Sequence, residues 1–303
     1  MGVSQITLAA DRLTCSKIAL GVWRSAEWQM QPTEILDLIE TCLALGITTI
    51  DHADIYGNYT CEGRFGDALA LNPNLRDQLQ LVTKCDIKLI SSNRPDHQVK
   101  HYDTSRAHII ASVENSLKQL RTDRLDLLLL HRPDPLMNVD ETAEALTDLR
   151  QAGKILEVGV SNFLPSQFDL LASRLDFPIV TNQVEFSVVH LEPLYDGTLD
   201  QCQRLRIAPM AWSPLGGGLL FQADSPQAKR LQVALQTVGE QLGDATIDQV
   251  ALAWILRHPA NVIPVLGTGK RDRIRTAAAA EQLQLSREQW FYILEASVGA
   301  PVP

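Results

Sequence analysis

Short apolar, β-branched segments alternate along this chain with stretches of helical periodicity, and this alternation limits the possible folds to few. The stretch 32–45 is a helical one, because apolar residues recur there at the spacing of one helix face and Gly46 follows. Strands separated by helices run parallel, and strands that are apolar on both faces belong to a sheet covered by helices. The segments that we interpret as strands number eight, at 19–23, 47–51, 81–84, 125–131, 155–161, 179–185, 207–213 and 262–266.

Eight such units in 303 residues average about 38 residues each, within the size of a (β/α)8 barrel with insertions. No linker rich in Pro, Gly or Ser divides the sequence. We therefore predict an α/β protein with one domain, a (β/α)8 TIM barrel over residues 1–303. The segments 6–8 and 13–15 flank Ala10-Asp11-Arg12, which predicts an N-terminal β-hairpin able to plug the barrel floor. Two longer insertions, about 86–107 and 215–228, follow strands, where barrels carry function.

Composition excludes several classes of protein. A hydrophobic content of 45% with 17 Gly and 15 Pro is typical of a globular chain. The longest apolar runs are far short of the ~20 residues that span a bilayer, and the first thirty residues carry no signal-peptide pattern, so we expect a cytoplasmic protein. Five cysteines without a Cys-x-x-Cys pair predict neither disulfides nor a metal site. A net charge of −9 disfavours nucleic acid as a partner.

Polar residues close five of the predicted strands. Asp51, Lys84 and His131 each end an apolar segment, where a charged group is costly to bury unless it is paired. Two further strands end in Ser161-Asn162 and Trp212-Ser213. Because the carboxyl ends of barrel strands meet at one mouth, which holds the active site in essentially every characterised barrel enzyme, we expect these side chains to converge.

Tyr56, five residues after Asp51, suggests the chemistry of this mouth. A phenol titrates near ~10 and needs a nearby cation to donate a proton readily at neutral pH, and Lys84 would be that cation. Asp51 would keep Lys84 charged and in place, while a neutral His131 would orient a substrate carbonyl by a hydrogen bond. The four residues predict an acid rather than a nucleophile. The alternatives are a structural Asp51–Lys84 ion pair and a satisfied core histidine.

Taken together, these segments resemble the aldo-keto reductase superfamily, and the resemblance covers essentially the whole chain. It implies a barrel that reduces aldehydes or ketones with NAD(P)H, with Asp51, Tyr56, Lys84 and His131 matching the catalytic tetrad. Trp23, with Tyr102 or Arg132, would line the substrate pocket. The motifs that carry the resemblance are Leu20-Gly21-Val22-Trp23, Asp51-His52-Ala53-Asp54-Ile55-Tyr56, Val82-Thr83-Lys84, residues 126–132, Gly159-Val160-Ser161-Asn162-Phe163, Trp212-Ser213-Pro214-Leu215-Gly216 and Gly267-Thr268-Gly269-Lys270.

The sequence contains neither a Gly-x-Gly-x-x-Gly fingerprint nor a P-loop, so a Rossmann module is not expected. The resemblance implies instead that loops after the seventh and eighth strands hold the pyrophosphate, through Ser213, Pro214, Leu215, Gly216 and Gly218, and through Gly267, Thr268, Gly269 and Lys270. Glycines let backbone N–H groups approach an anion, and a helix N-terminus favours negative charge. Ser161, Asn162 and Gln183 would bind the nicotinamide carboxamide, and Trp212 would stack on the ring.

Four cations in residues 270–275 stand out in an acidic chain. We expect Lys270 and Arg273 to bind the 2′-phosphate of NADPH (NADP+), whereas the plain alternative is a solvated helix face. Thr276-Ala277 stands where better-known reductases place Glu-Asn for the adenine side.

Two rival functions are open at this point. Lys84 could be the Schiff-base lysine of an aldolase-like barrel, although a lysine paired with Asp51 stays protonated and poorly nucleophilic. The chain could also be a cofactor-sensing interaction subunit with little turnover. The expected partner of the preferred function is a small-molecule carbonyl compound.

Overall fold

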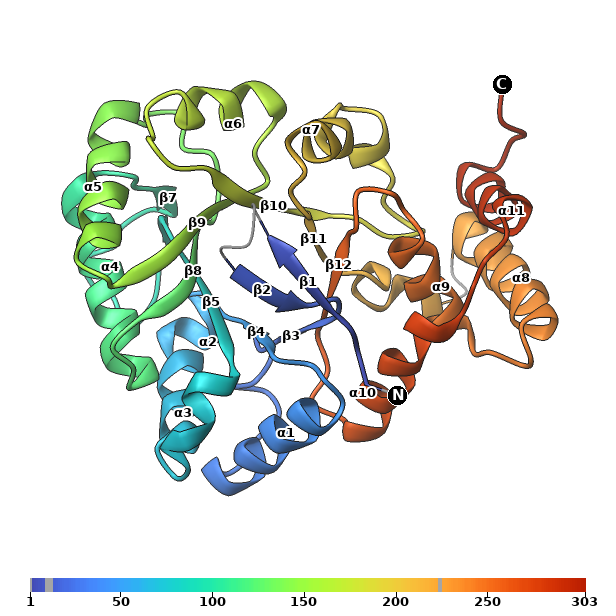
Figure 1. The fold of residues 1–303 in the computed structure, drawn as a ribbon, viewed down its shortest axis with the longest axis horizontal. Coiled ribbons are helices and arrows are strands. Elements are labelled where there is room, and N and C mark those ends of the chain that lie inside the picture. The colour runs from blue at the N-terminus through green and yellow to red at the C-terminus, as the bar shows by residue number, and fades with distance from the viewer. Residues whose placement is uncertain (1, 9–12, 223–224) are drawn as a thin grey trace.

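The computed structural model describes residues 2–8, 13–222 and 225–303, and its centre is a closed parallel barrel (Figure 1). Neighbouring strands follow one another in chain order, and the last pairs with the first. This confirms the predicted (β/α)8 TIM barrel. The barrel strands are β3 (Ala19–Gly21), β4 (Thr49–Asp51), β5 (Gln80–Cys85), β8 (Leu125–Leu130), β9 (Ile155–Ser161), β10 (Ile179–Glu185), β11 (Met210–Trp212) and β12 (Ile263–Leu266).

Helices surround the barrel on its outside (Figure 1). Helix α1, for example, buries Ile35, Leu38 and Ile39 on one apolar face, in the same core cluster as the strand residues Leu20 and Ile50. The longer helices are α1 (Pro32–Ala44), α3 (Cys61–Leu69), α4 (Arg106–Leu120), α5 (Val139–Gln151), α6 (Pro165–Ala172), α7 (Thr198–Leu205), α8 (Pro226–Gln241), α9 (Ile247–Leu256), α10 (Arg271–Ala279) and α11 (Arg287–Val298). In the part of the chain that the structure describes, no helix combines the length and apolarity needed to cross a membrane.

The predicted N-terminal hairpin is present as β1 (Gln5–Leu8) paired antiparallel with β2 (Leu13–Ser16). Its turn at Ala10-Asp11-Arg12 lies outside the described residues. Leu8, Leu13 and Cys15 cluster with residues of the barrel interior, among them Val82 and Met210. Because β2 leads directly into the start of β3, the hairpin covers the amino ends of the strands, and Figure 1 shows it across the middle of the barrel. The opposite, carboxyl end is left for the site.

The observed strands differ from the predicted ones mainly at their ends. His131 is the residue after β8, and the predicted strand 207–213 is shortened to β11. Pro209, which has no N–H to donate, precedes β11 directly. The insertion 86–107 contains a small antiparallel pair, β6 (Ile87–Lys88) with β7 (His101–Tyr102), and the insertion after β11 begins with the turns of η3 (Gly216–Phe221).

Candidate active site

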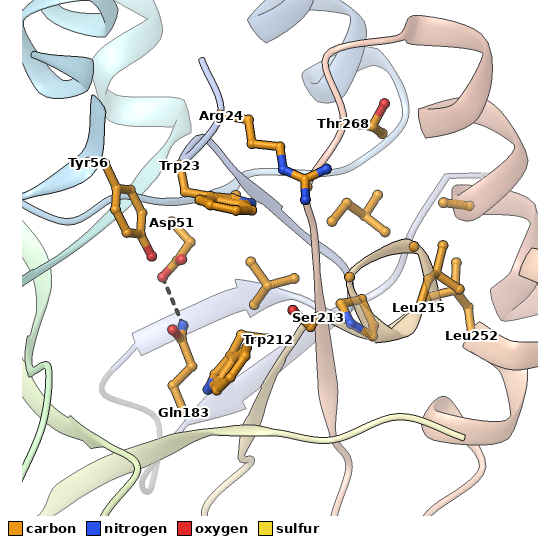
Figure 2. Close-up of a pocket in the computed structure, with 18 of the residues that line it drawn as sticks. Trp23, Arg24, Asp51, Tyr56, Gln183, Trp212, Ser213, Leu215, Leu252 and Thr268 are labelled. Carbon is orange, nitrogen blue, oxygen red and sulfur yellow. Dashed lines mark hydrogen bonds between the residues drawn. The ribbon is translucent and has the colours of Figure 1, made fainter. Parts of the chain in front are cut away.

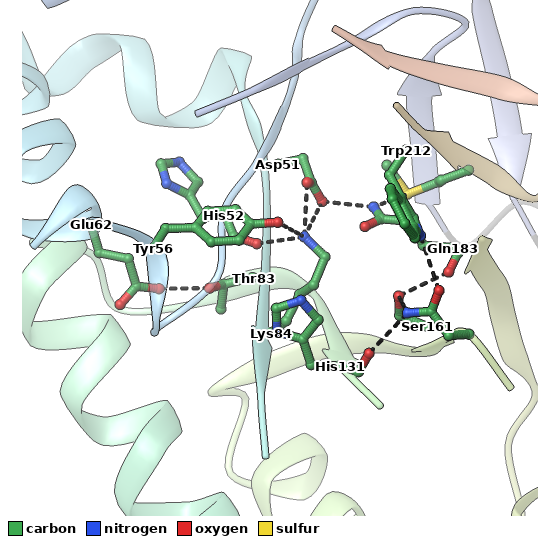
Figure 3. A network of polar contacts seen from close by, with 12 residues as sticks. Asp51, His52, Tyr56, Glu62, Thr83, Lys84, His131, Ser161, Gln183 and Trp212 are labelled. Atoms are coloured by element: carbon green, nitrogen blue, oxygen red, sulfur yellow. Dashed lines mark hydrogen bonds and ion pairs between the residues drawn. The ribbon is translucent and has the colours of Figure 1, made fainter. Parts of the chain in front are cut away.

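Three barrel strands and one loop bring the predicted tetrad together (Figure 3). Asp51 ends β4, Lys84 lies in β5 and His131 follows β8, while Tyr56 opens the short turn α2 (Tyr56–Tyr59). Lys84 Nζ lies 2.8 Å from both oxygens of Asp51 and 3.2 Å from the phenol oxygen of Tyr56. The convergence expected at the strand ends is therefore seen in the structure.

The ammonium of Lys84 is completely buried yet fully provided with acceptors. Its side chain is 0% exposed, and the carbonyl oxygen of His52 accepts a further hydrogen bond at 2.7 Å. Burial opposes the charged form, but the Asp51 carboxylate and the Tyr56 oxygen together hold the pKa of Lys84 above its ordinary value. The lysine is thus a fixed positive charge.

Tyr56 differs from the expectation of a phenol made more acidic by its cation. Burial raises the pKa of Tyr56 above its ordinary value, and Lys84 offsets this only in part. The desolvation of a phenolate inside the barrel mouth outweighs one neighbouring ammonium. The consequence is a phenol that stays protonated at neutral pH, with its O–H beside the cation that would stabilise the oxygen after proton release.

His131 packs edge-on to Tyr56, with ring centroids 6.0 Å apart and an interplanar angle of 79°. Burial, together with the charges of Lys84 and Arg132, holds the pKa of His131 well below its usual value. These effects favour the neutral imidazole, which still has one ring N–H to donate to a carbonyl oxygen.

A chain of hydrogen bonds continues from the tetrad to the neighbouring strand ends (Figure 3). Gln183 Nε2 donates to Asp51 Oδ1 at 2.8 Å, and Ser161 Oγ donates to the carbonyl oxygen of Gln183 at 2.8 Å. Asn162 Nδ2 donates to Ser161 Oγ at 2.8 Å, while Trp212 Nε1 donates to Asn162 Oδ1 at 3.0 Å. These contacts fix the face that Trp212 presents to the mouth.

A cavity of about 690 Å³ opens at this end of the barrel (Figure 2). Tyr56 and Trp23 lie at one side of it, and Leu215 and Leu252 at the other. Trp23, the expected substrate residue, is 47% exposed and has the Arg24 guanidinium over its ring at 4.5 Å. Of the predicted residues, the lining includes Trp23, Asp51, Tyr56, His131, Arg132, Ser161, Asn162, Gln183, Trp212, Ser213, Pro214, Leu215, Gly218, Gly267, Thr268 and Arg273.

Two glycine-containing loops form the part of the wall that would receive an anion. Gly217 and Gly218 both line the cavity with positive φ, and a Cβ added to either would meet nothing within 4 Å. Only glycine adopts such a backbone readily. On the other loop, Thr268 Oγ1 accepts from the N–H of Lys270, the residue before α10. Because α10 begins at Arg271, its first-turn N–H groups are free of intrahelical partners.

Five predicted residues lie outside the cavity lining. Lys84 stands behind Asp51 and Tyr56, which it contacts. Gly216 packs on Val189, and Gly269 packs on Trp28, so these glycines serve close packing. Lys270 is exposed at the start of α10. Tyr102 belongs to β7 and also lies outside the lining.

Sequence reasoning missed several lining residues, among them Phe221, Gln222, Asp248 and Leu252. Phe221 and Gln222 lie in the predicted insertion after β11, so the insertion itself was the available signal. Asp248 and Leu252 lie on α9, whose residues from Val250 to Ile255 are all apolar and buried. No pattern along the chain distinguishes a helix face that lines a cavity from one that packs on a strand.

Buried acids lie behind the tetrad. Glu62 accepts hydrogen bonds from Thr83 Oγ1 at 2.6 Å and Ser116 Oγ at 3.0 Å, and burial raises its pKa to about 7. Burial also raises the pKa values of Asp54 and Asp86 well above their ordinary range. Within residues 2–8, 13–222 and 225–303, no cluster of His, Cys, Asp and Glu is arranged to hold a metal, and the five cysteines are free thiols.

Comparisons with known proteins give consistent similarities. The model described as "Aldo/keto reductase family" matches residues 17–297. The chain is 50% identical over 301 residues to "Oxidoreductase YdhF" of Escherichia coli (strain K12), covering 99% of this chain and 100% of that protein. It is 46% identical over 295 residues to a "6-dehydroglucose reductase" of Agrobacterium fabrum, covering 97% of this chain and 98% of that protein.

A solved structure shows the same fold. The thermostable aldo-keto reductase Tm1743, in complex with the inhibitor epalrestat, superposes with a TM-score of 0.82 at 28% sequence identity. The match covers 97% of this chain and 99% of that chain.

Proposed function

Because this chain belongs to the aldo/keto reductase family and is an NAD(P)H-dependent oxidoreductase, we propose that it reduces an aldehyde or ketone to the alcohol with NADPH as hydride donor and Tyr56 as proton donor. The observation that carries the proposal is the position of Lys84 Nζ between Asp51 and the Tyr56 oxygen, directly behind the cavity wall that these two residues line. The proposal treats residues 1–303 as one catalytic domain.

The cavity wall fits a dinucleotide phosphate in the chemistry of its donors. Gly217 and Gly218 line the cavity without a Cβ and with open space in its place, and the amino end of α10 offers N–H groups to an anion. Arg273 lines the cavity from the same helix and is our choice for the 2′-phosphate. Lys270 is exposed and lies outside the cavity lining, so we propose that it contributes less than Arg273 to binding of the 2′-phosphate.

Ser161, Asn162 and Gln183 would bind the carboxamide of the nicotinamide, and Trp212 would stack on its ring. The reduced ring, when bound, supplies the hydride. The hydrogen bonds that already join Trp212 to Asn162 and Asn162 to Ser161 hold these side chains in one arrangement before any ligand enters. Less ordering is then required on binding.

The protein's own side chains would supply the proton and the hydrogen bonds that stabilise negative charge on the carbonyl oxygen. Tyr56 and neutral His131 both line the cavity and would donate hydrogen bonds to that oxygen. As negative charge develops there, Tyr56 transfers its proton, and Lys84 stabilises the phenolate left behind. Asp51 keeps Lys84 charged and aimed at Tyr56.

The reductase of Agrobacterium fabrum is named for 6-dehydroglucose, a sugar carrying a carbonyl group. We therefore propose a small polar carbonyl compound as substrate, and 6-dehydroglucose as the first sugar to test. Trp23, Arg24 and Arg132 would contact it at the mouth.

Replacing Tyr56 with Phe tests the proposal. Oxidation of NADPH by the variant should fall by about two to four orders of magnitude with each active aldehyde, because only the proton donor is lost. The dissociation constant for NADPH, measured by quenching of tryptophan fluorescence, should stay nearly unchanged. Equal turnover by the two proteins would refute the role of Tyr56.

The rival Schiff-base function makes a different prediction for the same protein. Borohydride added with a carbonyl substrate would leave a covalent adduct on Lys84 only if an imine forms. We expect no adduct, since the ion pair with Asp51 keeps Lys84 protonated. A stable complex with another protein, with negligible turnover of aldehydes, ketones and quinones, would instead favour a cofactor-sensing subunit.

A further inference from the structure

Helices α9 and α10 both contribute to the cavity wall, and the proposed function uses only α10; Leu252 of α9 lies on the side opposite Tyr56 (Figure 2). Asp248 and Leu252 lie one turn apart on α9, and Arg273 and Ala277 lie one turn apart on α10. Residues four apart share one helix face, and all four of these side chains line the cavity. The two faces therefore border the same end of it.

Asp248 places a negative charge in a cavity that we propose binds an anionic ligand, where a carboxylate would repel phosphate groups. Among the lining residues that the structure describes, Asp51 and Asp248 are the only acids, and Asp51 is paired with Lys84. The Asp248 carboxylate accepts a hydrogen bond from the Thr246 hydroxyl, and no cation within the described ranges lies within ion-pair distance of it. A carboxylate has about four acceptor positions, so Asp248, which lines the cavity, can accept further hydrogen bonds.

The proposed cofactor offers few donors at this end. Its phosphates are anionic and would be repelled by a carboxylate, and the ring nitrogens of adenine are acceptors. The exocyclic 6-amino group of adenine is a donor of two N–H bonds. Leu252 and Ala277 are both apolar and both line the cavity, so the surroundings of Asp248 suit the apolar faces of a base.

We propose that Asp248 recognises the adenine ring of the cofactor by accepting a hydrogen bond from its 6-amino group, with Leu252 and Ala277 enclosing the ring. This inference rests on the proposed function, because it assumes that a nicotinamide adenine dinucleotide occupies the cavity. It makes α9 the source of base recognition. Arg273, on the facing helix, is left to the 2′-phosphate.

The test compares binding of NADP+ with binding of its hypoxanthine analogue, in which a 6-oxo group replaces the 6-amino group. Isothermal titration calorimetry measures both affinities without substrate or turnover. The wild-type protein should bind NADP+ at least about tenfold more tightly than the hypoxanthine analogue. In the complex with the analogue, the Asp248 carboxylate would lose its hydrogen-bond donor and lie against the 6-oxo acceptor instead. Asp248→Ala and Asp248→Asn should bring the two affinities to within about twofold of each other, because the charged acceptor is gone.

Asp272→Asn is the matched control. This substitution also removes one negative charge, at the residue beside Arg273. The Asp272 side chain, however, is 97% exposed and pairs with Arg275 on the surface. This variant should keep the wild-type preference for the adenine form. A loss of base preference in Asp272→Asn equal to that in Asp248→Asn would overturn the inference, since general charge would then explain both.

Two other results would also overturn it, and they separate it from the proposed function. If Asp248→Asn keeps the wild-type preference for NADP+ over its hypoxanthine analogue, Asp248 does not recognise the adenine ring. The binding of NADP+ would still support the proposed function. If Asp248→Asn instead raises the ratio of NADP+ to NAD+ affinity, the carboxylate faces the 2′-phosphate. Failure of wild-type protein to bind either nucleotide would refute the proposed function and this inference together.

Discussion

At the scale of single residues, the arrangement of the site follows from the burial of one ammonium group, because that group requires acceptors on every side. Lys84 retains its charge in the barrel because Asp51 presents both carboxylate oxygens at 2.8 Å and a backbone carbonyl adds a third acceptor. Gln183 also donates to Asp51, so the pair belongs to a wider network. Removing one member leaves its partner buried without compensation, which costs more than removing both.

Lys84→Met should therefore lower the free energy of unfolding by about 3–5 kcal/mol, since Asp51 is left buried with Gln183 as its side-chain donor. The double variant Asp51→Asn/Lys84→Met should lose less. Urea unfolding of the three proteins measures these differences. Arg121→Met, which breaks a half-exposed pair with Asp67, serves as the control and should cost no more than about 1 kcal/mol. A Lys84→Met effect as small as that of the control would contradict the argument.

Glu62 links stability to pH. Burial raises its pKa from 4.5 to about 7, so the folded protein binds a proton more tightly than the unfolded chain does. The stability due to this group is fully present below pH 4.5, declines as the pH rises, and is lost above pH 7. The total change is on the order of 3 kcal/mol.

Glu62→Gln should remove this dependence, because an amide does not titrate. The difference in unfolding free energy between wild type and variant, measured in urea across the window from pH 4.5 to 7, should shift in favour of the variant as the pH rises. His52, whose pKa burial lowers to about 3, is present in both proteins and cancels in the difference. Parallel pH profiles would show that folding does not raise the pKa of Glu62.

At the scale of elements, parallel strands determine which residues meet. The tetrad side chains come from β4, β5 and the residues just after β4 and β8, and the register of the barrel brings their carboxyl ends to one mouth. Helices contribute to the site in a different way. The position of α9 and α10 in the packed fold, rather than strand register, places their residues at the cavity wall. The placement of α9 is therefore part of the site.

A pair of tryptophans fixes α9 against α11. Trp254 and Trp290 stack with ring centroids 4.6 Å apart and planes 6° from parallel. Each indole N–H donates to the backbone carbonyl of the other residue, at 3.0 and 3.1 Å. The Trp254 carbonyl lies in the last turn of α9, where intrahelical donors run out.

Trp290→Phe should lower the free energy of unfolding by about 1–3 kcal/mol, because it removes the donor to a sheltered carbonyl while keeping an aromatic ring. Thermal and urea unfolding measure the change. Tyr292→Phe, a neighbour that is 44% exposed, is the matched control and should behave like wild type. If Trp290→Phe is equally neutral, the stacked rings alone hold the two helices.

At the scale of the whole molecule, charge is distributed unevenly. The chain carries a net charge of −9, yet Arg24, Arg132 and Arg273 line the cavity, and in the described part of the chain none of them has an acidic partner within ion-pair distance. Cations left unpaired in a concave site raise the local concentration of anionic ligands. A phosphate-bearing cofactor is consistent with this distribution.

The barrel, the hairpin and the convergence of the predicted tetrad residues could be predicted from the chain alone. Strand and helix periodicity is local, and parallel strands send every strand-end residue to the same mouth, so Asp51, Lys84 and His131 could be placed together without coordinates. The tertiary structure alone decided that burial raises the pKa of Tyr56, that Gly216 and Gly269 pack away from the cavity, and that Asp248 lines it. Desolvation and helix packing depend on neighbours distant in the chain, and no pattern along the sequence encodes those distances.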